Sequence, residues 1–281
     1  MSQLLRHFGL DRHPFSRRTP KEALYRHRGF EEASRRLLFT LELDGMAAIM
    51  ASSGCGKSLL LGELADSLVG QGWSAHYFAH STTGPFGLVN TLARKIGLSP
   101  RRSRSETASA ISSRLIEDQR RHLLVVDEAH RLPDPTLEDL RLLTVADFDR
   151  QSPFHLILSG RPELDDRLAD PTHSALDQRI TTVARLMPLS ADETRQYIDI
   201  RLQAAGAKDQ PIFDEQAVDA LFDGTDGVPR RINNTATASM IVAAARGRRT
   251  VCAQDVHDAR LDRGRDVAPR DRLPTTNETP T

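Results

Sequence analysis

Residues 51–58 carry the side chains and the spacing of a phosphate-binding loop. The run Ala51-Ser-Ser-Gly-Cys-Gly-Lys-Ser58 directly follows the apolar stretch Met46-Ala-Ala-Ile-Met50. A buried strand that turns through glycines into a helix directs backbone N–H groups and the helix dipole at a polyphosphate. In this pattern Lys57 reaches the β- and γ-phosphates, and the Ser58 hydroxyl ligates Mg²⁺. The residues expected around the phosphates are Ser52, Ser53, Gly54, Cys55, Gly56, Lys57, Ser58 and Leu59.

One position of this loop departs from the usual pattern. Ala51 stands where the first glycine of G-x-x-x-x-G-K-[ST] is expected. Alanine is tolerated at a strand-to-turn position if its φ stays negative, so the departure weakens the motif without cancelling it. The alternative is a chance match in an ordinary loop, and the strand before the loop and the apolar helix after it argue against that alternative.

Two adjacent carboxylates end a second apolar run, His122-Leu-Leu-Val-Val-Asp127-Glu128. A run that is apolar on both faces is typical of a central strand in a parallel sheet covered by helices. Nucleotides bind at the carboxyl edge of such sheets. We therefore expect Asp127 to hold Mg²⁺ through water and Glu128 to orient and deprotonate the attacking water. The alternative is that both carboxylates merely begin a helix, whose first turn favours acidic residues.

The composition limits the class of protein. With 281 residues the chain is long enough for one large domain, or for a core with a smaller second domain. The formal net charge is zero, so any nucleic-acid surface must be local. Two cysteines provide no disulfide framework, and they fit a reducing cytoplasm. The sequence shows neither a long apolar run nor a signal-peptide pattern, which predicts a soluble cytoplasmic protein without membrane contact.

Strand and helix patterns alternate up to about residue 186, and only helical patterns follow. This alternation predicts right-handed βαβ units and a parallel sheet, with a helical second domain after it. Strands are expected at about 46–50, 74–79, 122–128, 154–158 and 180–186. Helices of the second domain are expected at about 191–205, 214–222, 229–245 and 253–261.

A phosphate loop, an Asp-Glu strand end, an arginine before the last strand and a helical region that opens with Gly227-Val-Pro-Arg-Arg231 occur together in this chain. Together they resemble the AAA+ ATPases. More narrowly, Phe8-Gly-Leu, Ser159-Gly-Arg-Pro-Glu-Leu164 and Leu176-Asp-Gln-Arg-Ile180 resemble the ExeA-type branch, over about residues 4–262. That branch includes secretion-linked ATPases and the transposon-encoded ATPases of the TniB and TnsC kind, which bind DNA and act on a transposase.

The resemblance implies an α/β fold, an AAA+ P-loop NTPase core in which helices sandwich a parallel sheet. The core is expected over residues 1–188, including an N-terminal extension. An all-helical lid is expected over 189–262 and a disordered tail over 263–281. The cofactors implied are ATP and Mg²⁺.

The resemblance also assigns roles to three further residues. Ser159 takes the sensor-1 position, although Arg161 competes for it because relatives more often carry glutamine there. Arg179 falls at the position of the arginine finger, which acts on the neighbouring subunit's nucleotide, and Arg230 matches the sensor-2 arginine of the lid. As alternatives, Ser159 caps the next helix, and Arg179 and Arg231 are solvated or salt-bridged surface residues.

Local basic clusters are the remaining signal. Residues 94–122 hold eight Lys/Arg against three acidic residues, and residues 230–249 hold five against none. Such clusters neutralise phosphates without reading bases, but they also occur on ordinary solvated helix faces. Related transposon ATPases line a central channel with the region after the second strand, and this implies DNA contacts from Arg94, Lys95, Arg101, Arg102 and Arg104. The second choice is the set of lid arginines Arg246, Arg248 and Arg249.

The leading hypothesis is a MgATP-hydrolysing homo-oligomer, a ring or a helical filament, that assembles on double-stranded DNA. It would regulate transposition by capturing target DNA for a transposase, with a target-selection protein as a further partner. One alternative is a secretion- or envelope-associated ATPase of the ExeA kind, whose relatives carry a membrane span after the ATPase. The end of this chain about twenty residues past the lid favours the DNA role. Another alternative is a nucleotide-gated switch with little turnover.

Overall fold

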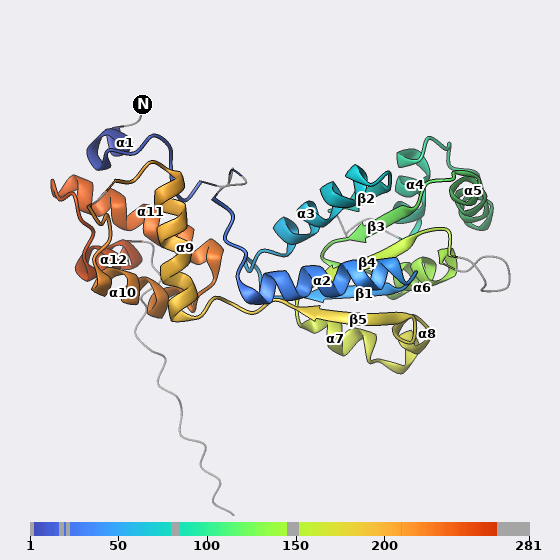
Figure 1. Cartoon of the computed structure of the whole chain (residues 1–281). Helices are drawn as coiled ribbons and strands as arrows, with labels where there is room; N and C mark the ends of the chain where they lie inside the picture. The colour runs from blue at the N-terminus through green and yellow to red at the C-terminus, as the bar shows by residue number, and fades with distance from the viewer. Residues whose placement is uncertain are drawn as a thin grey trace, which may run out of the picture. The chain divides into compact units, whose positions relative to one another are not determined.

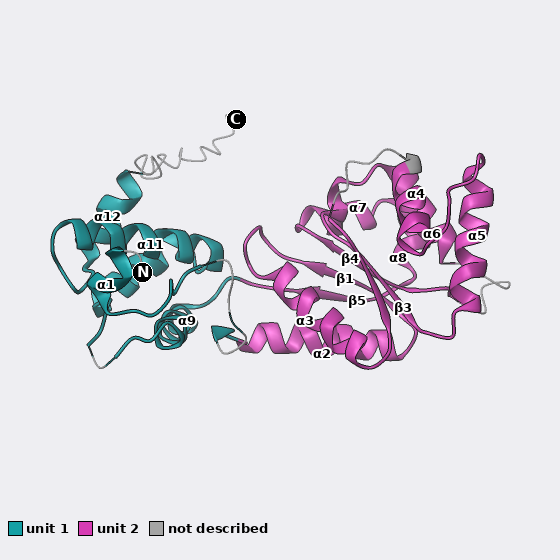
Figure 2. Ribbon diagram, turned by 90° about the horizontal axis from the view of Figure 1, so that it is seen from above, with its two compact units in different colours: residues 1–25, 188–281 teal, residues 26–187 magenta. Residues whose placement is uncertain are grey.

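The computed structural model describes residues 3–16, 20, 23–79, 85–144, 152–208 and 210–262. The chain forms two compact units: Arg26–Met187 is one, and Met1–Tyr25 together with Pro188–Thr281 is the other (Figure 2). The tail expected over 263–281 lies outside the described residues. No helix within the described ranges is both long and apolar enough to cross a membrane.

A five-stranded parallel sheet forms the centre of the Arg26–Met187 unit (Figure 1). The strand order is β2-β3-β4-β1-β5, so the phosphate loop follows a strand that lies inside the sheet. The strands are β1 (Met46–Met50), β2 (Ser74–Phe78), β3 (His122–Val126), β4 (His155–Gly160) and β5 (Ile180–Arg185). All residues of β1, β3 and β4 are buried, which confirms the sequence-based prediction of strands covered on both faces.

Helices flank this sheet. One core cluster joins Ala48, Leu124 and Leu156 of the strands to Leu92 and Ile111 of the helices. The strand residues in this cluster have even numbers, as expected for alternation with a period of two. The helices are α2 (Arg28–Glu42), α3 (Lys57–Gly70), α4 (Pro85–Lys95), α5 (Arg104–Glu117), α6 (Asp134–Leu143), α7 (Glu163–Leu168) and α8 (Ser174–Asp177), with 3₁₀ turns η2 (Ala129–Arg131) and η4 (Pro171–His173).

The second unit is helical. It contains α1 (Gln3–Phe8), α9 (Ala191–Ala204), α10 (Glu215–Thr225), α11 (Pro229–Ala245) and α12 (Ala253–Leu261). Ser190 and Glu193 form a capping box at the start of α9, in which the Ser190 hydroxyl accepts from the Glu193 backbone N–H at 3.2 Å. Asp214 caps α10 by accepting from the Ala217 backbone N–H at 2.7 Å. These signals explain why α9 and α10 begin close to the positions expected from the sequence.

The N-terminal segment packs with the helical unit, whereas the sequence analysis placed it with the α/β core. Leu5, Leu10 and Phe15 are buried in the core of the helical unit. Buried Arg201 on α9 donates from Nε to the carbonyl of Pro14 at 2.7 Å and from a terminal nitrogen to that of Ser16 at 2.9 Å. Isolated apolar anchors without strand periodicity do not reveal in the sequence which partner they pack against.

Gly227 allows the chain to pass close to Leu189 within the helical unit. Its φ is +66°, and a Cβ at this position would lie 1.9 Å from the Leu189 carbonyl oxygen. The left-handed conformation alone costs a non-glycine residue about 1–2 kcal/mol, and the backbone clash adds to that cost. We expect Gly227→Ala to destabilise the helical unit by more than about 2 kcal/mol, measured by hydrogen exchange of α9 and α11.

Gly62 on α3 provides the matched control. A Cβ there meets no atom within 4 Å, and the residue lies inside a helix. Gly62→Ala should therefore be neutral or stabilising by about 0.5–1 kcal/mol. Unchanged exchange rates in Gly227→Ala would show that the close approach to Leu189 is not a structural constraint.

Candidate functional site

The phosphate loop connects the end of β1 to the start of α3. Gly54 and Gly56 have φ values of +97° and +103°, and Gly56 is the N-cap residue of α3. Such positive φ values favour glycine, so this turn requires the two glycines that the motif supplies. Among the described residues, the non-glycine positions with positive φ are Asp44, Glu128 and Asp226. Ala51 is not among them, so it meets the condition under which alanine replaces the first glycine.

Lys57 is held inside this loop. Its Nζ donates to the Ala51 carbonyl at 2.6 Å, and the side chain is buried. Burial lowers the pKa of Lys57, while the charges of Asp127 and Glu128 oppose this change. The ammonium therefore lies in the electrostatic field of the Asp-Glu pair, although about seventy residues separate them in the sequence.

Asp127 accepts hydrogen bonds from both neighbouring strands. Its Oδ1 accepts from the Ser159 hydroxyl at 2.7 Å and from the Glu128 backbone N–H at 2.9 Å. Its Oδ2 accepts from the Tyr77 hydroxyl at 2.6 Å. The three side chains meet because β2 and β4 flank β3 in the sheet. Burial and the bond to Asp127 raise the pKa of Tyr77 to about 12, so this hydroxyl stays protonated and can donate.

Ser159 therefore bonds to a carboxylate on the neighbouring strand. Helix α7, which follows it, has Pro162 at its N-cap position. The alternative that Ser159 caps this helix does not match the structure. The charge of Arg161 lowers the pKa of Lys57, so Arg161 lies near the loop. Its effect is the smallest among the groups that shift this pKa.

Glu128 follows Asp127 in a strained backbone conformation. Its φ and ψ are +54° and +33°, the left-handed region that costs a non-glycine residue about 1–3 kcal/mol. Such strain is concentrated at active sites, where the surrounding structure holds it. A carboxylate oxygen of Glu128 lies 3.7 Å from Nε2 of His130.

Sequence reasoning did not identify Tyr77 or His130, because neither belongs to a spacing pattern that indicates its role.

Arg179 lies at the other end of the sheet from the phosphate loop. It directly precedes β5, whose first residue pairs with Met46 at the start of β1. The loop follows Met50 at the carboxyl end, and five strand residues span about 16 Å. Arg179 lines a cavity of about 590 Å³ together with Asp44, Arg121 and His155. Arg179 is therefore not placed for contact with the loop of its own chain.

Arg230, the other arginine to which the resemblance assigns a role, lies in the first turn of α11, in the helical unit.

The five basic residues chosen as DNA contacts differ in their surroundings. Arg94 and Lys95 are exposed at the end of α4, and Arg101 and Arg102 are exposed before α5. Arg104 instead forms an ion pair with Asp139 on α6 and donates to the Pro135 carbonyl at 3.1 Å.

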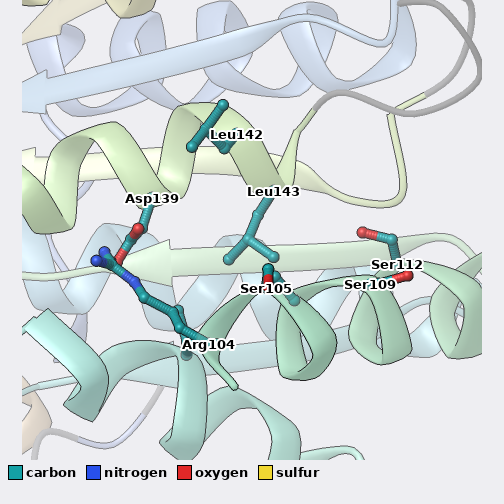
Figure 3. A pocket seen from close by; sticks show the side chains of 9 residues that line it. Arg104, Ser105, Ser109, Ser112, Asp139, Leu142 and Leu143 are labelled. Carbon is teal, nitrogen blue, oxygen red and sulfur yellow. The ribbon is translucent and has the colours of Figure 1, made fainter.

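A groove of about 460 Å³ between α5 and α6 surrounds this ion pair. Figure 3 shows Arg104 reaching toward Asp139, with Ser105, Ser109 and Ser112 along one wall. The charge of Arg104 is thus compensated within the chain, whereas the other four residues of this set are exposed. Among the other basic residues, Arg231 pairs with Asp226 at 2.8 Å, and Arg246 and Arg248 pair with Asp255.

The sheet order, the loop after β1, the Asp-Glu pair after β3 and the helical second unit define an AAA+ P-loop NTPase fold. Residues 41–168 match the protein family described as AAA domain, AAA_22. The α/β P-loop fold expected from the sequence is thus confirmed.

Two curated proteins share part of this sequence. General secretion pathway protein A of Aeromonas hydrophila is 39% identical over 137 residues, which cover 49% of this chain and 25% of that protein. An uncharacterized HTH-type transcriptional regulator of Methanocaldococcus jannaschii is 33% identical over 93 residues, which cover 32% of this chain and 22% of that protein. The matches therefore span about a quarter of the length of these relatives.

Solved structures of similar fold cover most of the chain. Cdc6p of Pyrobaculum aerophilum superposes with a TM-score of 0.70 at 20% identity, covering 89% of this chain and 70% of that one. The Aeropyrum pernix ORC1 protein in complex with DNA gives a TM-score of 0.64 at 20% identity, covering 88% and 68%. At such low identity these similarities establish the fold alone.

Proposed function

We propose that this protein binds MgATP and hydrolyses it to ADP and phosphate. The observation that carries the proposal is the arrangement at one sheet edge: Lys57 inside a glycine-built loop, oriented Asp127, and Glu128 beside it. Phosphoryl transfer depends mostly on positioning and electrostatic stabilisation, and this edge provides both. Glu128 is the residue that would take the proton from the attacking water.

The residues at this edge fit a magnesium ion. The Ser58 hydroxyl and the Asp127 carboxylate are hard oxygen donors, which Mg²⁺ prefers. Magnesium in nucleotide sites usually takes one or two protein ligands, with water and phosphate oxygens completing its coordination. When bound, the ion would neutralise charge on the β- and γ-phosphates. Ser159 and Tyr77 hold the carboxylate that would face it.

We further propose that the active form is a homo-oligomer that assembles on double-stranded DNA. The position of Arg179, away from its own loop, supports a role at a neighbouring subunit's nucleotide. Exposed Arg94, Lys95, Arg101 and Arg102 support contact with phosphates. Similar folds occur in an ORC1 protein in complex with DNA and a Drosophila ORC bound to DNA. Imaging with a non-hydrolysable ATP analogue, with and without duplex DNA, tests the assembly directly.

Within this proposal, the protein would regulate transposition by delivering target DNA to a transposase, with a target-selection protein as a further partner. The support is the motif resemblance to transposon-encoded ATPases together with the basic stretch after β2. Lid residue Arg230 would then sense the γ-phosphate. ATP would raise DNA affinity by ordering the oligomer, so that individually weak sites act together.

Replacing Arg101 and Arg102 together by Glu should remove DNA association and leave ATP binding intact. Each lost phosphate contact lowers the slope of log affinity against log salt by about 0.9, and an oligomer multiplies that loss. Arg104 is left unchanged, because Glu at this position would face Asp139 on α6. Fluorescence anisotropy of a duplex over a range of salt concentrations measures the slope.

The control is the double change of exposed Arg35 and Arg36 on α2 to Glu, which alters net charge equally outside the basic stretch. This control should bind duplex DNA like the parent protein. If the Arg101 and Arg102 variant still binds DNA with an unchanged salt slope, the DNA contacts must lie elsewhere. Arg246, Arg248 and Arg249 are then the next candidates.

A second candidate function is an envelope- or secretion-linked ATPase. It is favoured by the 39% identity to General secretion pathway protein A over 137 residues. Absence of duplex binding in the presence of ATP, together with normal hydrolysis, would support this candidate. A nucleotide-gated switch with little turnover would bind ATP tightly and release no phosphate.

A further inference from the structure

His130 contacts two elements of the site at once. It lies in the 3₁₀ turn η2, two residues after Glu128, and its side chain is nine-tenths buried. The main-chain N–H of Arg161, just after β4, donates to its Nδ1 at 3.3 Å. On the other side of the ring, Nε2 lies 3.7 Å from Oε2 of Glu128.

The contact with Arg161 determines which nitrogen of the ring carries the hydrogen. A nitrogen that accepts a hydrogen bond has no hydrogen of its own, so the single hydrogen of a neutral ring is on Nε2. Burial lowers the pKa of His130, against the opposing charges of Glu128 and Glu163 and with the support of Arg161 and Arg131. Burial therefore favours the neutral ring, whose Nε2 lies on the side of the Glu128 carboxylate, 3.7 Å away and just beyond hydrogen-bond distance.

Glu128 needs such a donor. Its backbone is in the left-handed region and its side chain is about one-third exposed, so the strand that ends at Val126 does not fix the carboxylate. A general base must lie within about 3 Å of the proton it removes. A displacement of about 1 Å can reduce the rate about 100-fold.

We propose that His130 is a positioning residue, whose Nε2–H orients the Glu128 carboxylate and whose Nδ1 connects it to the main chain after Ser159. The inference rests on the proposed ATP hydrolysis. It adds a connection, through His130, between the end of β4 and the general base. A movement at the end of β4, where Ser159 lies, is transmitted through one imidazole ring to the base. His130 itself touches neither nucleotide nor metal in this proposal.

Two variants and a control test this role by steady-state phosphate release and nucleotide binding. His130→Phe keeps a ring without polar atoms and should lower kcat about 100-fold, with an ATP Kd within twofold of the parent. His130→Gln keeps one acceptor and one donor and should recover most of that loss. Arg114→Gln, at an exposed position of α5, should match the parent.

Each outcome bears on the proposal. A kcat within threefold of the parent in His130→Phe would overturn it. Equal losses in the Phe and Gln variants would indicate that shape alone matters and would also overturn it. A parent protein that releases no phosphate would overturn the proposed hydrolysis, and the positioning role with it; an active parent with an unaffected Phe variant would overturn the positioning role alone.

A second measurement does not depend on turnover. Nitrogen-15 NMR of labelled histidine rings, with the His130 signal identified by its loss in His130→Gln, reports which nitrogen carries the hydrogen. We expect hydrogen on Nε2, and we expect the Nε2 signal to shift in Glu128→Gln while the other rings stay unchanged. Hydrogen on Nδ1, or an Nε2 signal insensitive to Glu128→Gln, would overturn the proposal.

Discussion

Glu128→Gln is expected to bind MgATP as tightly as the parent protein and to hydrolyse it about 1000-fold more slowly. Removing a general base costs about 100- to 10,000-fold, and the amide cannot accept the proton of the attacking water. The substitution keeps the length and shape of the side chain, so the strained backbone at this position should tolerate it. Steady-state phosphate release and binding of a fluorescent ATP analogue separate turnover from affinity.

Glu117→Gln is the matched control, because this residue is exposed at the end of α5. It removes the same charge from the same unit and should leave both rate and affinity unchanged. If Glu128→Gln hydrolyses ATP at the parent rate, the assignment of the base is wrong, and the proton must leave by another route.

Arg179→Ala is expected to bind ATP nearly normally and to lose at least 1000-fold in turnover. Arginines supplied from a neighbouring subunit contribute about 10³–10⁵ to rate by neutralising charge in the transition state. Arg179 precedes β5 at the amino end of the sheet, so it is placed to act on another subunit's nucleotide. Arg120→Ala is the control, since Arg120 lines the same cavity and pairs with Asp118 at 2.8 Å.

Mixing Arg179→Ala with Lys57→Ala subunits tests the action between subunits. Lys57→Ala subunits should lose tight ATP binding but keep Arg179, so composite sites with one intact half from each variant should recover some activity. Recovery should depend on the mixing ratio. A mixture that stays inactive at all ratios would place Arg179 outside the catalytic arrangement.

The sequence predicted the fold well where burial and capping leave a local pattern. β1, β3 and β4 are mostly apolar and buried on both faces, and α9 begins with the Ser190 and Glu193 capping box. The order of the strands leaves no such pattern, because it depends on which helices pack together. The short helix α8 was not predicted from the sequence either, since four residues are too few to show a helical period.

The candidate site was predictable in part for the same reason. Lys57, Asp127 and Glu128 follow known spacings, whereas the bonds from Ser159 and Tyr77 to Asp127 arise from strand order. Charge counting does not reveal that Arg104 is paired, because its partner Asp139 lies 35 residues further along the chain. A contact between distant parts of the chain cannot be recognised from either sequence segment alone.

The anchoring of residues 3–16 to the helical unit affects how the protein folds during synthesis. Leu5, Leu10 and Phe15 emerge from the ribosome before the other buried members of their core cluster, which begin with Leu189 and α9. At about 5–20 residues per second, the intervening chain takes roughly 10–35 s to synthesise. The Arg26–Met187 unit is contiguous and can fold during this interval, while the N-terminal apolar side chains remain uncovered. A nascent chain that stalls before α9 therefore presents these side chains to chaperones.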